Sequence, residues 1–158
     1  MTPLIIYYSF GGNTRRIAER IGRELSADLC AIETAAPYTG SYTEIVDQGA
    51  QEVKSGFMPP LKPCAADLSQ YGTIILGSPV WWYTFAPAMK TFLHEHPLSG
   101  KQVYPFATNG GWLGHTFQDF EAACPGAAVK KGLSVRFDGT QLRTEEAEIL
   151  NWVKHIGK

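Results

Sequence analysis

Short runs of apolar residues alternate along the chain with longer segments in which apolar residues recur three or four positions apart. Most of the short runs are rich in β-branched and aromatic residues, and they predict strands. The first, Leu4-Ile5-Ile6-Tyr7-Tyr8, is apolar at every position, which indicates a strand buried on both faces, as in a parallel sheet. The five predicted strands cover residues 4–8, 29–33, 73–77, 102–107 and 133–137.

The segments between these runs predict amphipathic helices. After Thr14, the residues Ile17, Ile21 and Leu25 recur four positions apart, and arginine and glutamate occupy many of the positions between them. The predicted helices cover residues 14–25, 43–54, 87–93, 117–124 and 144–156. Strands that alternate with helices through right-handed connections give a parallel sheet with helices on both faces, so the expected fold class is α/β.

The composition is that of one soluble domain. A chain of 158 residues suits a single core, so we expect one domain over residues 1–158. Hydrophobic residues make up 44% and charged residues 18%, which excludes a disordered chain. The formal net charge of -1 argues against nucleic acid and anionic membranes as partners. Because the N-terminus runs directly into the first strand without a signal-like segment, we expect a cytoplasmic location.

The three cysteines, Cys30, Cys64 and Cys124, form no recognisable metal-binding motif. An odd number of cysteines without C-x-x-C spacing also argues against a disulfide framework. We therefore interpret them as structural or surface thiols, and we predict no metal site.

The loops after the first, third and fourth strands are the candidate sites, because ligands of doubly wound sheets bind beyond the carboxyl ends of the strands. The first loop leads into a helix N-terminus, where backbone N–H groups favour an anion. It lacks both the lysine of a nucleotide-hydrolysing P-loop and the glycine spacing of a dinucleotide site. The pattern suits a phosphate monoester, although a tight turn with a helix cap is also compatible with it. The candidate phosphate residues are Ser9, Phe10, Gly11, Gly12, Asn13 and Thr14.

The other two loops suit a flat heteroaromatic ring. The segment from Ser78 to Phe85 is expected to be a surface loop, yet it holds four aromatic residues. We expect at least one of them to fill the core or an interface between copies of the chain. The segment from Thr108 to Gly114 is rich in glycine, and its Trp112 could cover the second face of a ring; the nearby His115 is interpreted as an exposed loop residue. The candidate ring residues are Pro79, Val80, Trp81, Trp82, Tyr83, Thr108, Asn109, Gly110, Gly111, Trp112 and Gly114.

The three loops together resemble those of the flavodoxin family. The order strand, S-x-x-G-N-T, helix is similar to that family's phosphate loop, and S-P-V-W-W and T-N-G-G-W are similar to its two flavin-ring loops. Within the family, the chain resembles the short proteins with a double-tryptophan loop. The resemblance implies a doubly wound five-stranded parallel sheet in the order 2-1-3-4-5, with FMN as a non-covalent cofactor. Two positions depart from the family pattern: Gly11 replaces the usual threonine, and Tyr83 replaces a frequent glycine.

Three functions remain open at this level. The resemblance favours an FMN-binding electron-transfer protein that serves a redox partner protein or a small-molecule electron acceptor. The near-neutral net charge is unusual for a mobile carrier of this family, which keeps open an FMN-dependent NAD(P)H:quinone-type oxidoreductase. Such enzymes usually dimerise, so the chain is expected to be a monomer or a homodimer. The third possibility is a flavin-free binding module on the same fold.

Overall fold

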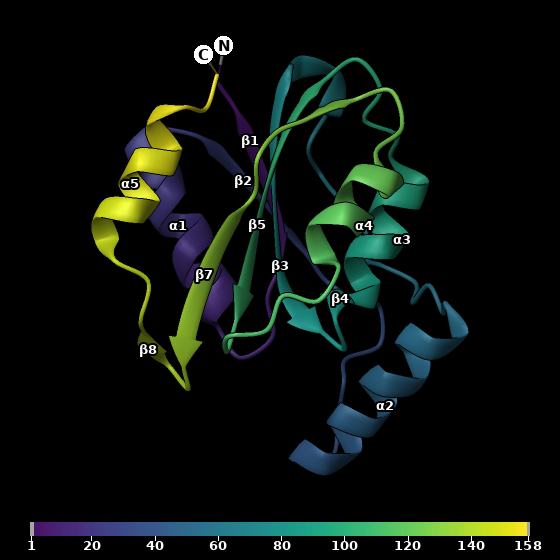
Figure 1. The fold of residues 1–158 in the computed structure, drawn as a ribbon. Coiled ribbons are helices and arrows are strands. Elements are labelled where there is room, and N and C mark those ends of the chain that lie inside the picture. The colour runs from purple at the N-terminus through teal and green to yellow at the C-terminus, as the bar shows by residue number, and fades with distance from the viewer. Residues whose placement is uncertain (1, 158) are drawn as a thin grey trace.

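Strands and helices alternate in the computed structural model, which describes residues 2–157 (Figure 1). The strands are β1 (Leu4–Tyr8), β2 (Asp28–Ile32), β3 (Thr73–Trp81), β4 (Thr84–Phe85), β5 (Gln102–Asn109), β6 (Ala128–Val129), β7 (Leu133–Asp138) and β8 (Gln141–Leu142). The helices are α1 (Asn13–Leu25), α2 (Tyr42–Ser55), α3 (Pro87–Glu95), α4 (Thr116–Ala123) and α5 (Glu146–Lys154), with a short 3₁₀ turn at Leu68–Gln70. Within residues 2–157 no helix combines the length and the apolar character needed to cross a membrane.

Five of the strands form a parallel sheet in the order β2-β1-β3-β5-β7. Counted along these five strands, this is the predicted order 2-1-3-4-5, and the predicted doubly wound α/β fold is confirmed. The short strands β4 and β8 pair antiparallel with β3 and β7, respectively. Strand β6 pairs with the start of β5 and β7 with its end, so the fifth position of the sheet is interrupted between Val129 and Leu133.

Helices cover both faces of the sheet. In Figure 1, α1 and α5 lie on one side of it and α3 and α4 on the other. Strand β1 lies between the two layers. Its Ile5 and Tyr7 belong to the core cluster that includes residues of α1 and α5, and its Leu4, Ile6 and Tyr8 belong to the cluster on the α3 and α4 side. All five side chains are buried, which explains why every position of the strand is apolar.

Helix α2 contributes little to the core. Among its described residues only Gly49 and Glu52 are buried. Its start is fixed by a capping box, in which Ser41 and Glu44 each bond the other's backbone N–H, and it ends at Gly56 with a positive φ of 71°. In Figure 1, α2 projects beyond the carboxyl ends of the central strands. There it lies beside the hairpin that connects β3 with β4.

The prediction that Ser78 to Phe85 form a surface loop is wrong. Strand β3 continues through these positions to Trp81, and a two-residue turn connects it to β4, with Trp81 paired to Thr84. Phe85 is buried, and its ring packs against Phe120 with centroids 4.8 Å apart. The turn contains none of the glycine or asparagine residues that usually signal a tight hairpin, so the sequence offered no sign of it.

Candidate functional site

The loop between β1 and α1 forms the first part of the site. Gly11 and Gly12 adopt positive φ values of 86° and 100°, which side-chain-bearing residues rarely adopt. A Cβ atom at either position would meet no heavy atom within 4 Å, so the loop has open space beside it. The Oγ of Ser9 accepts a hydrogen bond from the N–H of Arg15 at 3.0 Å. The N–H groups of Asn13 and Thr14, at the start of the same helix, have no acceptor within the helix and can bind an anion.

A pair of buried threonine hydroxyls stands beside this loop. Thr14 is 1% exposed and Thr108 4% exposed, and their Oγ1 atoms lie 2.7 Å apart. Because one hydroxyl donates to the other, the second keeps its hydrogen for an external acceptor. The Nδ2 of Asn13 donates to the carbonyl oxygen of Gly139 at 2.9 Å, which connects the loop to the turn between β7 and β8.

A hollow of about 220 Å³ opens next to the hydroxyl pair. Within the part of the chain that the structure describes, its lining has no charged side chain. Phe137 and Gly139 also line it, although the sequence had not indicated them as site residues. The Asp138-Gly139 pair at the end of β7 is a hairpin signal that could have drawn attention to them. The hollow is lined by Phe10, Asn13, Thr14, Pro79, Thr108, Asn109, Gly110, Phe137 and Gly139.

The hairpin between β3 and β4 forms the second part of the site. Trp82 and Tyr83, the two turn residues, have positive φ values of 51° and 71°, as in a type I′ turn. Such angles are strained for bulky residues, so surrounding contacts must hold them. The indole N–H of Trp82 donates to the carbonyl oxygen of Val46 in α2 at 3.2 Å, and the N–H of His115 donates to the carbonyl oxygen of Tyr83 at 2.8 Å. The turn is thus supported from both sides.

Aromatic side chains of the hairpin have two different roles. Trp81 is half-buried and packs edge-to-face against Tyr8, Phe10 and Tyr38, with ring centroids 5.8, 5.9 and 5.2 Å away. It is therefore largely structural, as expected for at least one of these rings. Trp82 and Tyr83 are 46% and 50% exposed, and both are available to a ligand or a partner.

Tyr38, which the sequence had not indicated, connects this aromatic cluster to α2 through the buried carboxylate of Glu52. Its hydroxyl donates to Oε1 of Glu52 at 2.6 Å, and the side-chain amide of Gln48 donates to Oε2 of Glu52 at 2.9 Å. Burial, together with the hydrogen bond to Glu52, raises the pKa of Tyr38 well above its usual range. Tyr38 therefore stays protonated and keeps donating to Glu52, which fixes α2 relative to Trp81.

The loop after β5 forms the third part of the site. Asn109 shapes it, because its Nδ2 donates to Oγ of Ser134 at 3.0 Å and its Oδ1 accepts from the N–H of Gly111 at 2.8 Å. Trp112 is 70% exposed at the end of the loop. Gly114 presses against the hairpin, since a Cβ there would lie 2.4 Å from the carbonyl oxygen of Tyr83.

Two further hollows extend the first one along the carboxyl edge of the sheet. One of about 280 Å³ is lined by Phe10, Tyr42, Ile45, Val46, Gly49, Val80, Trp81 and Trp82. One of about 290 Å³ is lined by Val80, Trp82, Tyr83, Asn109, Gly110 and Trp112. Each hollow shares lining residues with the other two, so together they form one groove, which is called the edge groove below.

The profile of the flavodoxin family matches residues 2–156, which is nearly the whole chain. The chain belongs to the flavodoxin family. Among solved structures, this flavodoxin is similar to a candidate flavoprotein from Bacteroides eggerthii, at 29% identity over 99% of this chain and 98% of that one, with a TM-score of 0.84. It is also similar to a flavoprotein from Lactobacillus acidophilus in complex with FMN, at 24% identity over 96% and 97% of the two chains and a TM-score of 0.74. No curated protein sequence matches it.

A third similar structure is oxidised flavodoxin 1 from Bacillus cereus, at 20% identity over 98% of this chain and 93% of that one, with a TM-score of 0.58. The match to the family profile confirms the predicted family. The family membership and the FMN complex of the Lactobacillus protein support FMN, the cofactor predicted from the sequence.

The predicted site residues of this flavodoxin divide into lining and shaping groups. The residues that line the edge groove are Phe10, Asn13, Thr14, Pro79, Val80, Trp81, Trp82, Tyr83, Thr108, Asn109, Gly110 and Trp112. The remaining five set the course of the backbone in the described loops: Ser9, Gly11, Gly12, Gly111 and Gly114. The sequence therefore indicated the three loops that border the edge groove, but it could not separate residues that line the groove from residues that only shape the loops.

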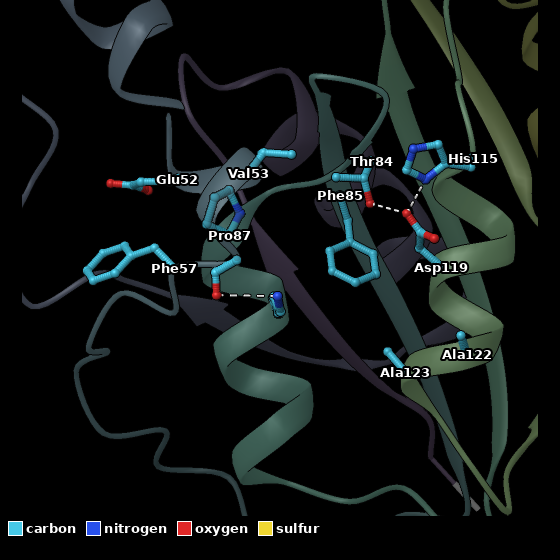
Figure 2. A pocket seen from close by; sticks show the side chains of 12 residues that line it. Glu52, Val53, Phe57, Thr84, Phe85, Pro87, His115, Asp119, Ala122 and Ala123 are labelled. Atoms are coloured by element: carbon cyan, nitrogen blue, oxygen red, sulfur yellow. Dashed lines mark hydrogen bonds and ion pairs between the residues drawn. The ribbon is translucent and has the colours of Figure 1, made fainter. Parts of the chain in front are cut away.

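A separate cavity of about 420 Å³ lies behind the hairpin, between α2, α3 and α4 (Figure 2). Figure 2 shows the carboxylate of Asp119 between the imidazole of His115 and the hydroxyl of Thr84, and it forms a hydrogen bond with each of them. Lys90 also lines the cavity, and its Nζ donates to the carbonyl oxygen of Gly56 at 3.3 Å. His115 is exposed as expected, but it is also part of this polar network. Within residues 2–157 no cluster of three His, Cys, Asp or Glu side chains could hold a metal ion.

The positive φ of Tyr83 leads to a first prediction about stability. We expect Tyr83→Asn to be more stable than Tyr83→Ala by about 1 kcal/mol, because asparagine tolerates positive φ whereas alanine does not. The two variants remove the same exposed ring, so each controls for its loss in the other. Urea denaturation of both proteins measures the difference. Equal stabilities would show that position 83 is not held in the left-handed region.

Proposed function

We propose that this flavodoxin binds FMN in the edge groove and uses it for electron transfer. The single observation that carries the proposal is the arrangement of the groove: N–H groups and a hydroxyl pair at one end, and exposed aromatic side chains at the other. The phosphate would lie at the start of α1, near the hydroxyls of Thr14 and Thr108. The flavin ring would lie against the 80–83 hairpin and the 109–112 loop.

The residues present fit a phosphate monoester attached to a flat ring. The open space beside Gly11 and Gly12 admits a phosphate close to the backbone. Attraction for the phosphate comes from the N-terminus of α1, where backbone N–H groups and the helix dipole favour an anion. The absence of lysine from the first loop matches a site that holds a phosphate without hydrolysing it.

The other end of the groove suits electron exchange with a partner. Bound FMN carries one or two electrons, and the protein tunes its potentials through local hydrogen bonds and charge. Trp82, Tyr83 and Trp112 surround this end of the groove and are all exposed. An exposed aromatic rim lets a redox partner protein, or a small-molecule acceptor, approach the edge of the ring without a conformational change.

An FMN titration followed by reduction tests this function. Purified protein should quench the fluorescence of added FMN at one equivalent, and the dithionite-reduced complex should pass electrons to a one-electron acceptor such as cytochrome c. If FMN does not bind, the chain is a flavin-free binding module on the flavodoxin fold. If FMN binds but one-electron acceptors are not reduced, the electron-transfer role is wrong and the flavin assignment stands.

A variant of the Thr14–Thr108 hydroxyl pair tests where the phosphate binds. Thr14→Ala should weaken FMN binding by roughly five- to a hundred-fold, because a hydrogen bond to a charged group is worth about 1–3 kcal/mol. Thr14→Ser keeps the hydroxyl and is the matched control, which should retain near-normal affinity. Isothermal titration of both variants with FMN gives the dissociation constants. An unchanged affinity in Thr14→Ala would place the phosphate elsewhere.

An FMN-dependent NAD(P)H:quinone-type oxidoreductase is the second candidate, favoured by the net charge of -1. A neutral surface gives little electrostatic steering towards a charged protein partner. Two measurements separate the candidates: NAD(P)H consumption by the FMN complex in the presence of a benzoquinone, and the molar mass in solution. Rapid turnover by a dimer supports the enzyme, whereas no turnover supports the carrier.

A further inference from the structure

Two of the three cysteines lie side by side although 34 positions separate them. Cys30 belongs to the edge strand β2, and Cys64 to the segment that connects α2 with β3. Their Sγ atoms are 2.6 Å apart, and both side chains are half-buried. Cys124 is fully buried at the end of α4 and belongs to neither segment. The spacing of the cysteines along the sequence contained no sign of this pair.

The backbone holds the two segments together without help from the thiols. Thr34 and Leu61 form an antiparallel bridge just beyond β2. The N–H of Ala35 donates to the carbonyl oxygen of Pro60 at 2.8 Å, and the N–H of Lys62 donates to the carbonyl oxygen of Glu33 at 2.9 Å. These bonds fix the chain on both sides of the bridge, so the two sulfurs face each other at a high effective concentration.

We propose that Cys30 and Cys64 form a reversible intramolecular disulfide, which makes this pair a redox modification site. A disulfide bond is about 2.05 Å long, so a small side-chain adjustment closes it. The proposal depends only on the thiol pair and its backbone support. It therefore stands or falls independently of FMN binding and of electron transfer.

Oxidised glutathione is a sufficient oxidant. The thiolate of one cysteine of the pair attacks one sulfur of the glutathione disulfide, which forms a mixed disulfide and releases one glutathione thiolate. The thiolate of the other cysteine then attacks the protein sulfur of the mixed disulfide, which forms the protein disulfide and releases the second glutathione. Two electrons and the two cysteine protons pass to the two glutathione molecules, so the exchange is balanced.

Burial, and the hydrogen bond with Cys64, raise the pKa of the Cys30 thiol to about 12, so Cys30 is protonated at neutral pH in the reduced pair. Because thiol exchange requires a thiolate, oxidation of the pair should become faster as the pH rises. In either single variant, Cys30→Ser or Cys64→Ser, the protein disulfide cannot close, so reaction with oxidised glutathione should stop at the mixed disulfide.

The test equilibrates the purified protein with buffers of graded reduced-to-oxidised glutathione ratio. Remaining thiols are alkylated after acid quenching and denaturation, and the mass is measured. Reduced protein should take up three alkyl groups, one for each cysteine, and oxidised protein only one, at Cys124. Because the disulfide closes a loop of 34 positions, oxidation should also raise Tm by roughly 5–12 °C.

Matched variants decide the outcome. Cys124→Ala removes the third thiol and should keep both the oxidation and the rise in Tm. Cys64→Ser, in an irregular and half-exposed segment, should fold normally by circular dichroism but lose both effects. Three alkylated cysteines at the most oxidising ratio would overturn the proposal, as would a disulfide between two chains or a wild-type protein that stops at the glutathione adduct.

Discussion

Replacing Gly77 by alanine is expected to destabilise the protein by about 3 kcal/mol, which corresponds to a fall in Tm of roughly 6–12 °C. Gly77 lies in the central strand β3, directly opposite Phe106 of β5. A Cβ at position 77 would lie 2.2 Å from the ring of Phe106, which is fully buried. The ring cannot swing towards solvent, so the sheet or the core around it must shift. Thermal and urea unfolding measure the loss.

A double variant tests whether the ring is the cause. Phe106→Leu shortens the side chain that the new methyl group would meet, at a cost of its own. If the contact between positions 77 and 106 is responsible, Gly77→Ala combined with Phe106→Leu should be more stable than the sum of the single effects by about 1 kcal/mol or more. Strict additivity would show that the destabilisation arises elsewhere.

Replacing Gly114 by alanine is expected to destabilise the protein by about 3 kcal/mol as well, and to weaken FMN binding roughly tenfold or more. Two effects combine here. Gly114 has a positive φ of 57°, and a Cβ there would lie within 2.5 Å of three atoms of Tyr83, two of them in the backbone. The substitution must therefore displace the hairpin whose turn borders the edge groove. Unfolding curves and an FMN titration measure the two losses separately.

Gly100 provides the matched control for this second prediction. Its φ of 82° is also positive, but a Cβ there would meet no atom within 4 Å, and it lies outside the three loops. Gly100→Ala should therefore show only the cost of the left-handed backbone, about 1–2 kcal/mol, with normal FMN affinity. If the two alanine variants lose the same stability and both bind FMN normally, Gly114 does not support the hairpin.

The sequence by itself determined the fold and which loops are candidates for the site. Strand β1 is apolar at each position because both faces of a central parallel strand are buried, and this can be recognised without coordinates. The change from a run of β-formers to a four-residue period after Thr14 likewise predicted α1. Once strands and helices alternate, few topologies remain, and the position of the candidate loops follows from the switch-point rule.

Only the tertiary structure decided which groups in those loops face one another. The turn at Trp82 and Tyr83 carries no local signal, because its positive φ values are enforced from outside, by the carbonyl oxygen of Val46 and the N–H of His115. The bond between Thr14 and Thr108 and the contact between Cys30 and Cys64 likewise join segments far apart in the chain. Periodicity along a sequence reports the direction that each side chain takes from its own element. Contacts between elements also depend on how tightly those elements pack, which no single segment encodes.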